Sequence, residues 1–146
     1  ITDVRMTRFM ITLREAVLAV QTALSSHSGG NIFVKKIPSM KVTDIAEALF
    51  PGRPKEIVGI RPGEKLHEQM VSPEEASRTI NSGGFYIIRP EINAASLSQQ
   101  ENHEQSEFAD CKYVDDSFSY ASNTNSSWMT HSELVDWVVA NKHSYV

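Results

Sequence analysis

The sequence predicts an α/β fold organised as one compact domain, and three observations lead to this prediction. Short β-like runs alternate along the chain with runs whose apolar residues recur at helical spacing. The 146 residues, 40% of them hydrophobic, suffice for one core and leave no room for a second full domain. The single cysteine excludes an internal disulfide framework, so packing alone must stabilise the fold.

The first half of the chain predicts strands and helices in alternation. The expected elements are a strand at 9–12, a helix from Leu13 to the Gly29-Gly30 stop, a strand at 31–34, a helix at 43–49 and a strand at 56–60. The strands at 31–34 and 56–60 flank a helix. We therefore expect them to pair in parallel as a βαβ unit.

Two capping boxes mark helix starts in the second half. Ser72-Pro73-Glu74-Glu75 combines a serine cap, proline at the first helical position and glutamate three residues after the cap, and predicts a short helix to about Ile80. Thr130-His131-Ser132-Glu133 predicts the start of a final helix in the same way. Between them we expect a strand at 84–88 and a polar loop at about 93–117, rich in Ser, Gln, Asn and Glu.

Charge is distributed unevenly. Residues 1–65 contain ten Lys/Arg and six Asp/Glu (+4), and residues 66–146 contain four and twelve (−8), which together give the net charge of −4. A basic half within an acidic chain fits a local anion site better than a nucleic-acid surface, which needs a larger basic field. We therefore expect no nucleic-acid partner. Charge alone leaves open that these cations are simply solvated.

Targeting signals are missing from the sequence. It contains no signal peptide and no apolar run of membrane-spanning length. With only Cys111 as a thiol, these features predict a reducing, cytoplasmic location and no membrane partner. The chain opens at Ile1 without a methionine, which we interpret as a piece of a longer protein.

Two arginines border the β-like runs. Arg61 follows the third expected strand, at the position where open α/β sheets gather ligands. Pro62 biases the preceding backbone towards an extended conformation and Gly63 permits a turn, so the base of the Arg61 side chain is held in place. Arg8 precedes the first run. Because a guanidinium can form two parallel hydrogen bonds with one anion, the pair predicts a diphosphate clamp. The alternative, that Arg61 pairs with Glu64 in a stabilising turn, stays open.

The sequence supports a metal site or a reactive cysteine less well than it supports an anion site at the two arginines. His67-Glu68 matches part of a zinc-protease motif, but position 71 is Val and the five histidines show no ligand spacing. Cys111 lies in the polar segment without a pattern of basic neighbours that would require a thiolate nucleophile. We therefore expect no metal site and no nucleophilic cysteine.

Long runs of the sequence resemble the C-terminal half of the inverting UDP-N-acetylglucosamine 4,6-dehydratases, members of the extended short-chain dehydrogenase/reductase family. The runs are ITDVRMTRFMITL (1–13), GGNIFVKKIPSMKVTDIAEAL (29–49), GIRPGEKLHEQM (59–70) and FYIIRPEI (85–92). The similarity covers essentially the whole chain, is weakest at 93–117, and resumes at Tyr120-Ala121-Ser122-Asn123-Thr124-Asn125 and Trp128. Several long motifs in the same order are more specific than any one of them.

The resemblance implies a small mixed α/β domain over residues 1–146 that binds a UDP-sugar, with the Rossmann half absent. It implies that Arg8 and Arg61 lie at the diphosphate, and that Thr7, Glu64 and Lys65 support them. It further implies that the complete enzyme is an NADP-dependent, homo-oligomeric lyase of surface-polysaccharide or flagellin-glycan biosynthesis. The family's glycine-rich loop and Tyr-x-x-x-Lys pair do not occur in this sequence. We therefore expect this chain alone to contain no catalytic residue, to bind no cofactor and to be inactive.

Two other functions stay open at this stage. The chain could instead be a portion of a related nucleotide-sugar epimerase, or a non-catalytic binding or assembly module with the same fold. The Ser122-Asn123-Thr124 stretch admits two interpretations, a conformational lid or subunit contact and a polar turn, of which we favour the turn.

Overall fold

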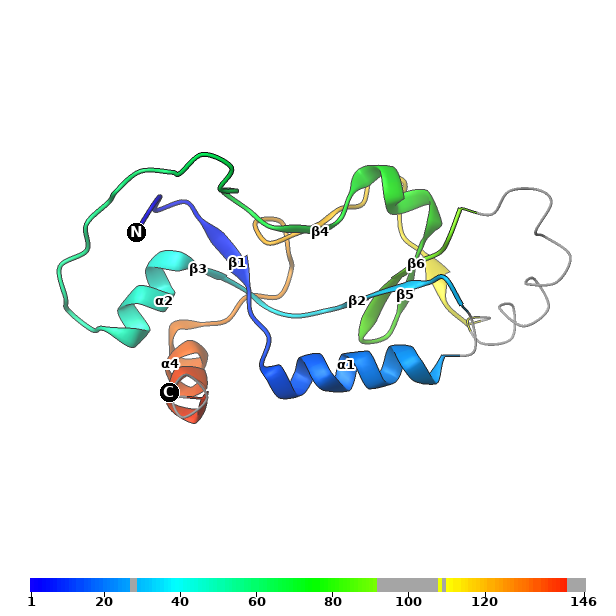
Figure 1. Cartoon of the computed structure of the whole chain (residues 1–146), viewed down its shortest axis with the longest axis horizontal. Coiled ribbons are helices and arrows are strands. Elements are labelled where there is room, and N and C mark those ends of the chain that lie inside the picture. The colour runs from blue at the N-terminus through cyan, green and yellow to red at the C-terminus, as the bar shows by residue number, and fades with distance from the viewer. Residues whose placement is uncertain (27–28, 92–107, 109, 142–146) are drawn as a thin grey trace, which may run out of the picture. The chain divides into compact units, whose positions relative to one another are not determined.

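A computed structural model describes residues 1–26, 29–91, 108 and 110–141. The chain contains both helices and short strands (Figure 1), so the expected mixed α/β class is confirmed. The elements are β1 (Thr7–Phe9), α1 (Leu13–Ser25), β2 (Ile32–Lys35), β3 (Ser39–Lys41), α2 (Val42–Leu49), β4 (Gln69–Val71), the 3₁₀ helix η1 (Pro73–Arg78), β5 (Thr79–Ser82), β6 (Phe85–Ile88), β7 (Lys112–Tyr113), β8 (Tyr120–Ala121) and α4 (His131–Asn141).

The chain forms two compact units, each assembled from segments that are distant in sequence. The first unit contains Ile1–Thr12, Ile37–Gln69 and Ala121–Val146, and the second contains Leu13–Lys36 and Met70–Tyr120. The expectation of a single domain over residues 1–146 stays a prediction.

The second unit is built on a four-stranded antiparallel sheet with the order β2-β6-β5-β7. β5 and β6 form a hairpin in which Thr79 lies opposite Ile88 and Ser82 opposite Phe85. Ile87 and Ile88 point to opposite faces of β6, because side chains alternate along a strand. Both are buried, so the sheet is covered on both faces at this strand.

The capping box at Ser72 is confirmed, but the helix it begins differs from the predicted one. The Ser72 N–H donates to Glu75 Oε2 at 3.0 Å, as a capping box requires. The helix is of the 3₁₀ type and ends at Arg78. The predicted extension to about Ile80 is wrong, because Ile80 lies on β5 and pairs with Ile87 of β6.

The first unit contains the antiparallel pair β1–β3 and the helices α2 and α4. Thr7 lies opposite Lys41 and Phe9 opposite Ser39. The predicted second helix and final helix are both confirmed as α2 and α4. At the start of α4 the Thr130 N–H donates to Glu133 Oε2 at 2.8 Å, and the Glu133 N–H donates to Thr130 Oγ1 at 3.3 Å, which confirms the second capping box.

The strand predicted at 56–60 is wrong, and so is the parallel βαβ unit. Residues 51–63 are exposed and form no strand, and β2 instead pairs antiparallel with β6. The backbone at Gly59 has φ +84, which interrupts an extended conformation. A short apolar run also does not distinguish a strand from an exposed extended segment.

Several boundaries differ from the prediction. β1 covers Thr7–Phe9 rather than 9–12. Strands of two to four residues at β3, β4, β5, β7 and β8 were not predicted. Most of the polar loop expected at 93–117 lies outside the described residues, and β7 occupies part of the remainder. Such short strands carry too few residues for their periodicity to be recognised.

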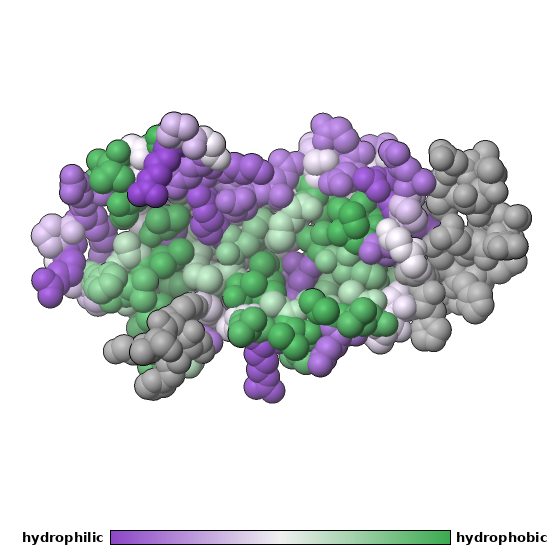
Figure 2. Space-filling view, in the orientation of Figure 1, coloured by the Kyte–Doolittle hydropathy of each residue, from purple (hydrophilic) through white to green (hydrophobic). Residues whose placement is uncertain are grey.

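Helix α1 is confirmed, but none of its described residues is buried. Figure 2 shows the apolar surface over this helix. The most exposed apolar side chains of α1 are Leu13 (81%), Val20 (59%) and Leu24 (79%). Helical periodicity therefore predicted the helix correctly without predicting its burial. No helix within the described part of the chain is both long and apolar enough to cross a membrane.

Candidate functional site

The segment Arg61-Pro62-Gly63-Glu64 forms a tight turn in the first unit. The Glu64 N–H donates to the Arg61 carbonyl at 3.0 Å, and the Arg61 N–H donates back to Glu64 Oε2 at 3.1 Å. Pro62 in the second position and Gly63 in the third, with φ +81, are typical of a type II turn. Thr2 Oγ1 donates to the other carboxylate oxygen of Glu64 at 3.1 Å. The backbone under Arg61 is thus held by several hydrogen bonds.

Arg61 lies in the exposed part of this turn. Glu64 pairs with its backbone N–H, and the guanidinium has no hydrogen-bond or ion-pair partner among the described residues. The alternative of an Arg61–Glu64 pair is therefore correct for the backbone N–H of Arg61, which donates to the Glu64 carboxylate. It is not correct for the guanidinium of Arg61. A planar set of donors on a fixed turn is left available for a ligand.

Arg8, on β1, binds the segment that follows the turn. Its side chain is 26% exposed. Its two terminal nitrogens and Nε contact the Thr7 carbonyl (2.8 Å), the Lys65 carbonyl (3.0 Å), the Leu66 carbonyl (3.2 Å), Glu68 Oε1 (3.5 Å) and Met6 Sδ (3.7 Å). The three carbonyl contacts are ordinary hydrogen bonds, and the two contacts to Glu68 and Met6 are long and weak. Arg8 therefore anchors the segment that presents Arg61.

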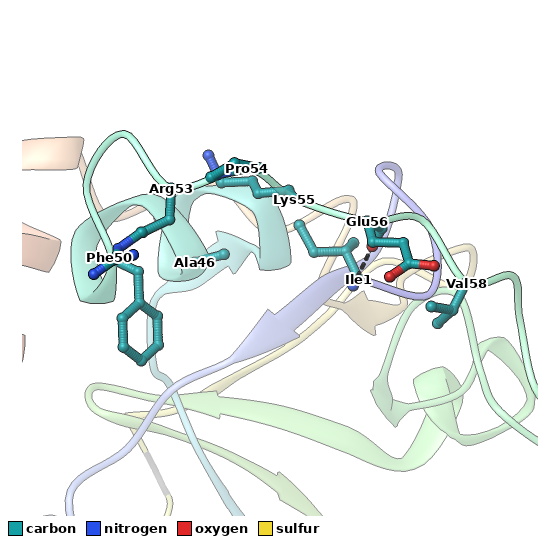
Figure 3. Close-up of a pocket in the computed structure, with 8 residues that line it drawn as sticks. All are labelled: Ile1, Ala46, Phe50, Arg53, Pro54, Lys55, Glu56 and Val58. Carbon is teal, nitrogen blue, oxygen red and sulfur yellow. Dashed lines mark hydrogen bonds between the residues drawn. The ribbon is translucent and has the colours of Figure 1, made fainter.

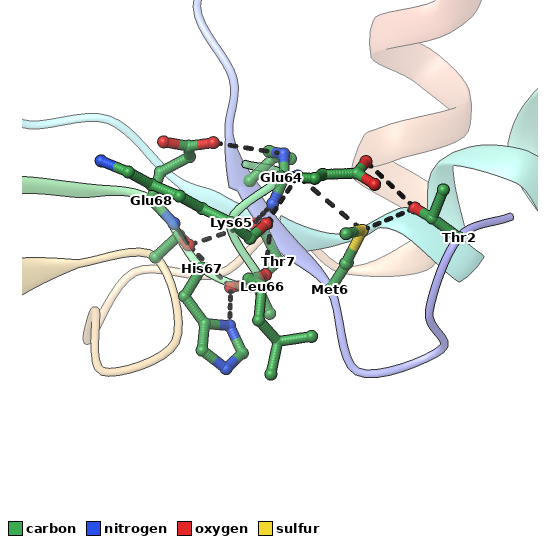
Figure 4. Close-up of polar contacts among 10 residues, drawn as sticks. Thr2, Met6, Thr7, Glu64, Lys65, Leu66, His67 and Glu68 are labelled. Atoms are coloured by element: carbon green, nitrogen blue, oxygen red, sulfur yellow. Dashed lines mark hydrogen bonds and ion pairs between the residues drawn. The ribbon is translucent and has the colours of Figure 1, made fainter. Parts of the chain in front are cut away.

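A second set of hydrogen bonds attaches the same segment to β1. The Thr7 N–H donates to the Leu66 carbonyl at 3.2 Å. The Thr7 hydroxyl lies 2.8 Å from His67 Nδ1 and 2.6 Å from Ser122 Oγ. Ser122 is fully buried, and its N–H donates to the Glu68 carbonyl at 2.8 Å. Figure 4 shows the His67 ring joined to Thr7 by a dashed line, with the Glu68 side chain pointing the other way.

The structure brings the five predicted residues into one unit and one hydrogen-bonded region. Thr7 and Arg8 lie on β1, and Arg61, Glu64 and Lys65 lie on the segment bound to it. Lys65 contributes only its carbonyl, and the residue is exposed. Their role in binding a ligand stays a prediction.

Ser122 and His67 are part of this region and were missed. The turn favoured for residues 122–124 is confirmed, but the side chain of Ser122 lies at the buried end of the hydrogen-bond network. Thr7 and Ser122 are separated by 115 positions, so no local pattern links them. For His67, its place in the run GIRPGEKLHEQM was the available signal.

The pocket shown in Figure 3 lies apart from the predicted residues. It has a volume of about 440 Å³ and is lined by Ile1, Ala46, Phe50, Arg53, Pro54, Lys55, Glu56 and Val58. The backbone nitrogen of Ile1 lies 2.8 Å from the Glu56 carbonyl oxygen on one side of the pocket. Lys55 ion-pairs with Glu47, so its charge is already engaged. None of the five predicted site residues lines this pocket.

An exposed ion pair lies near the predicted site. Asp3 accepts hydrogen bonds from Arg5 Nη2 at 2.7 Å and from the Arg5 backbone N–H at 2.8 Å. These bonds, the side-chain one first, lower the pKa of Asp3 to about 2. His67 also acts on Asp3 electrostatically and lowers its pKa in the same direction. Asp3 thus contributes a negative charge near His67.

Neither a cluster of metal ligands among the described residues nor a dinucleotide-binding motif in the sequence is present. Within the described residues, no group of three His, Cys, Asp or Glu side chains could hold a metal ion. The full sequence has no G-x-G-x-x-G loop, which binds the pyrophosphate of a dinucleotide, and no Tyr-x-x-x-Lys pair.

A comparison with protein families identifies the class of this protein. Residues 1–90 match the model of a family described as polysaccharide biosynthesis protein. This match spans more than half of the chain, and the chain belongs to that family. The resemblance to the dehydratases at the family level is thereby confirmed.

Individual relatives narrow the class. The chain is 41% identical over 137 residues to a UDP-N-acetylglucosamine 4,6-dehydratase (inverting) of Campylobacter jejuni serotype O:23/36, with 93% of this chain and 40% of the relative covered. A UDP-glucose 4-epimerase of Rickettsia felis is 38% identical over 92 residues, covering 60% of this chain and 27% of the epimerase. The chain thus spans less than half the length of both relatives.

A solved structure has the same fold. Pen from Bacillus thuringiensis matches 97% of this chain and 41% of its own chain, with a TM-score of 0.75. The sequence identity is 24%. At this identity the match supports the fold and nothing about the ligand.

Proposed function

We propose that this chain is the UDP-sugar-binding portion of an inverting UDP-N-acetylglucosamine 4,6-dehydratase. The dehydratase match extends over 93% of the chain, whereas the epimerase match extends over 60%, which supports the dehydratase. We further propose that the complete protein is a cytoplasmic, homo-oligomeric lyase of surface-polysaccharide or flagellin-glycan biosynthesis. NADP would bind outside these 146 residues, and this chain alone would be inactive.

The observation that supports the binding role most strongly is the exposed Arg61 guanidinium on a turn fixed by Glu64. A diphosphate offers oxygens to both nitrogens of a guanidinium at once, and ordering the turn beforehand reduces the entropy lost on binding. Arg8 would provide the second cation. Its weak contacts with Glu68 and Met6, at 3.5 and 3.7 Å, can be exchanged for phosphate oxygens while the carbonyl contacts keep it in place.

The other predicted residues act on these arginines. Glu64 closes the turn, and the Thr7 backbone N–H and the Arg8 side chain hold the segment that follows it. Lys65 adds an exposed cation next to Glu64, which would raise the local positive potential. This chain thus binds and orients the nucleotide end of the substrate, and the bond-breaking steps belong to other parts of the protein.

Calorimetry of UDP binding to the 146-residue chain tests the proposal. Arg61→Ala is expected to weaken binding at least about tenfold, because a charge-assisted hydrogen bond contributes about 1.5–3 kcal/mol. Arg8→Ala is expected to weaken binding as well. Arg53→Ala serves as the matched control, since it removes an exposed arginine of the same unit outside the proposed site. Unchanged affinity in both Arg61→Ala and Arg8→Ala would exclude the diphosphate role.

An epimerase portion is the second candidate, supported by the Rickettsia relative. Product analysis with the longer protein separates the two, because a dehydratase eliminates water from the sugar and an epimerase does not. A non-catalytic module is the third. It predicts that the longer protein lacks both the glycine-rich loop and the Tyr-x-x-x-Lys pair.

A further inference from the structure

The contacts around Thr7 concern which ring nitrogen of His67 carries the proton. Four contacts meet at two hydroxyl groups, Thr7 Oγ1 and Ser122 Oγ. Thr7 Oγ1 lies 2.8 Å from His67 Nδ1 and 2.6 Å from Ser122 Oγ. Ser122 Oγ also lies 2.9 Å from the Glu68 amide nitrogen and 3.1 Å from the Thr7 carbonyl oxygen. Each hydroxyl has one proton to donate, so the directions of these bonds depend on one another.

Two of the directions follow from the chemistry of the backbone. The Glu68 N–H can only donate, so Ser122 Oγ accepts from it. The Thr7 carbonyl can only accept, so Ser122 donates its proton there. With that proton used, the 2.6 Å contact between the hydroxyls requires Thr7 to donate to Ser122. The Thr7 proton is then also used, and His67 must donate from Nδ1.

The reverse direction is less favourable. If Ser122 donated to Thr7 Oγ1, and Thr7 to an unprotonated His67 Nδ1, no proton would lie between Ser122 Oγ and the Thr7 carbonyl oxygen, 3.1 Å away. Two acceptor oxygens would then face each other at a fully buried side chain. The Thr7 carbonyl would still accept from Arg8 at 2.8 Å, but the repulsion between the two oxygens disfavours this arrangement. The first arrangement satisfies all four contacts.

We propose that His67 is a positioning residue that carries its proton on Nδ1 and thereby fixes the segment 61–68 against β1. The hydrogen-bond chain runs from His67 through Thr7 to Ser122, which in turn holds the Glu68 amide. Arg8 contacts the carbonyls of the same segment. Figure 4 shows the other ring nitrogen of His67 pointing away from the residues labelled there. In the neutral ring this nitrogen, Nε2, is left as an acceptor.

Nitrogen NMR of the histidine rings tests the proton position directly. The 146-residue chain is labelled with ¹⁵N, and His67 is assigned by comparison with His67→Asn. At a pH where titration shows the ring to be neutral, we expect the Nδ1–H tautomer, although free histidine in water favours Nε2–H. A neutral His67 that is predominantly Nε2–H would overturn the proposal. This measurement does not depend on any ligand.

Two variants of similar size test the positioning role. His67→Asn keeps an N–H donor close to the position of Nδ1, and His67→Leu removes it. We expect amide hydrogen exchange at Glu68 to be at least about tenfold faster in His67→Leu and close to the wild type in His67→Asn. Equal exchange in the two variants would overturn the role of the donor. His131→Leu, at an exposed histidine of the same unit, is expected to leave exchange at Glu68 unchanged.

The effect on ligand binding rests on the proposed function. We expect UDP affinity to fall at least about fivefold in His67→Leu and to stay within about twofold of the wild type in His67→Asn. If the wild-type chain binds no UDP, the proposed function fails, while the tautomer and the exchange rates still decide the role of His67. If UDP binds and His67→Leu retains full affinity, positioning of the arginines by His67 is excluded.

Discussion

In the first unit, the described residues bury as many hydroxyl-bearing side chains as apolar ones, whereas the second unit buries mainly aliphatic ones. The first set is Met6, Met40 and Leu134 with Thr7, Ser39 and Ser122. The second set is Val34, Val71, Ala76, Ile80, Ile87, Ile88 and Tyr120 with Thr79. Apolar packing is non-directional, but hydrogen bonds specify the positions of their partners.

This difference explains where the candidate site lies. The sheet of the second unit is stabilised by packing, which depends on volume more than on orientation. The first unit positions two arginines through bonds of 2.6–3.2 Å among β1, the segment 61–68 and Ser122. Buried polar networks of this kind are costly when incomplete. We therefore expect the stability lost on mutation to depend mainly on the volume removed in the second unit and on the hydrogen bonds removed in the first.

The largest expected effect is on the aliphatic core of the second unit. Ile87→Ala is expected to lower the free energy of unfolding by about 3 kcal/mol, since Ile87 is 1% exposed and truncation leaves a cavity. Ile32→Ala removes the same atoms from β2, where the side chain is 52% exposed, and should cost much less. Urea titration measures both. Similar losses in the two variants would contradict the described packing.

In the first unit, replacing one side chain by another of the same shape should be enough to lower the free energy of unfolding. Asn125 Nδ2 donates to the Ile37 carbonyl at 2.9 Å and to Ser39 Oγ at 3.0 Å. Asn125→Asp replaces these donors with carboxylate oxygen and should cost about 2 kcal/mol of unfolding free energy. Asn123→Asp makes the same charge change at an exposed position of the same segment and should be close to neutral. Equal unfolding midpoints for the two would show that the unit does not depend on directional bonds.

A smaller effect is expected at the turn. Gly63→Ala meets no atom within 4 Å, but the backbone there has φ +81, which costs a residue with a side chain about 1 kcal/mol. Gly84→Ala also has open space and no such backbone strain. We expect Gly63→Ala alone to lose stability in urea titration. Gly63→Ala should also lose UDP affinity, because the turn orients Arg61. If Gly63→Ala retained full stability, the turn would tolerate another backbone conformation.

The smallest effect concerns the exposed pair of Asp3 and Arg5. The pKa of Asp3 is lowered from 3.8 to about 2, so its ionised form favours the folded state. The contribution is present above pH 3.8 and is lost as the pH falls through about 2. In Arg5→Ala we expect the pKa of Asp3 to return towards 3.8, measured by carboxyl ¹³C NMR during acid titration. An Asp3 pKa that is the same with and without Arg5 would contradict this pairing.

Local signals were the most predictive. The capping boxes at Ser72 and Thr130 both form, because their bonds join residues three positions apart. The spacing of apolar residues located α1 and α2 for a similar reason. The apolar run at 56–60 was misread, because whether such a run becomes a strand depends on a partner that local sequence does not specify.

The candidate site was predictable in part. Pro62 and Gly63 indicated a turn, and a type II arrangement is observed. The position of Arg61 was expected at the end of a parallel strand, and it instead lies on an exposed turn after an irregular segment. The motif thus predicted the local conformation correctly and its place in the sheet incorrectly.

The sequence by itself determined the family, three helices, the strands at β2 and β6, and the turn that bears Arg61, since each depends on neighbouring residues or on long motifs. The tertiary structure alone decided the antiparallel sheet order, the exposure of α1 and the contact of Thr7 with Ser122. The physical reason is the separation along the chain of the residues that interact. Bonds between residues 115 positions apart form only when the folded chain brings them together.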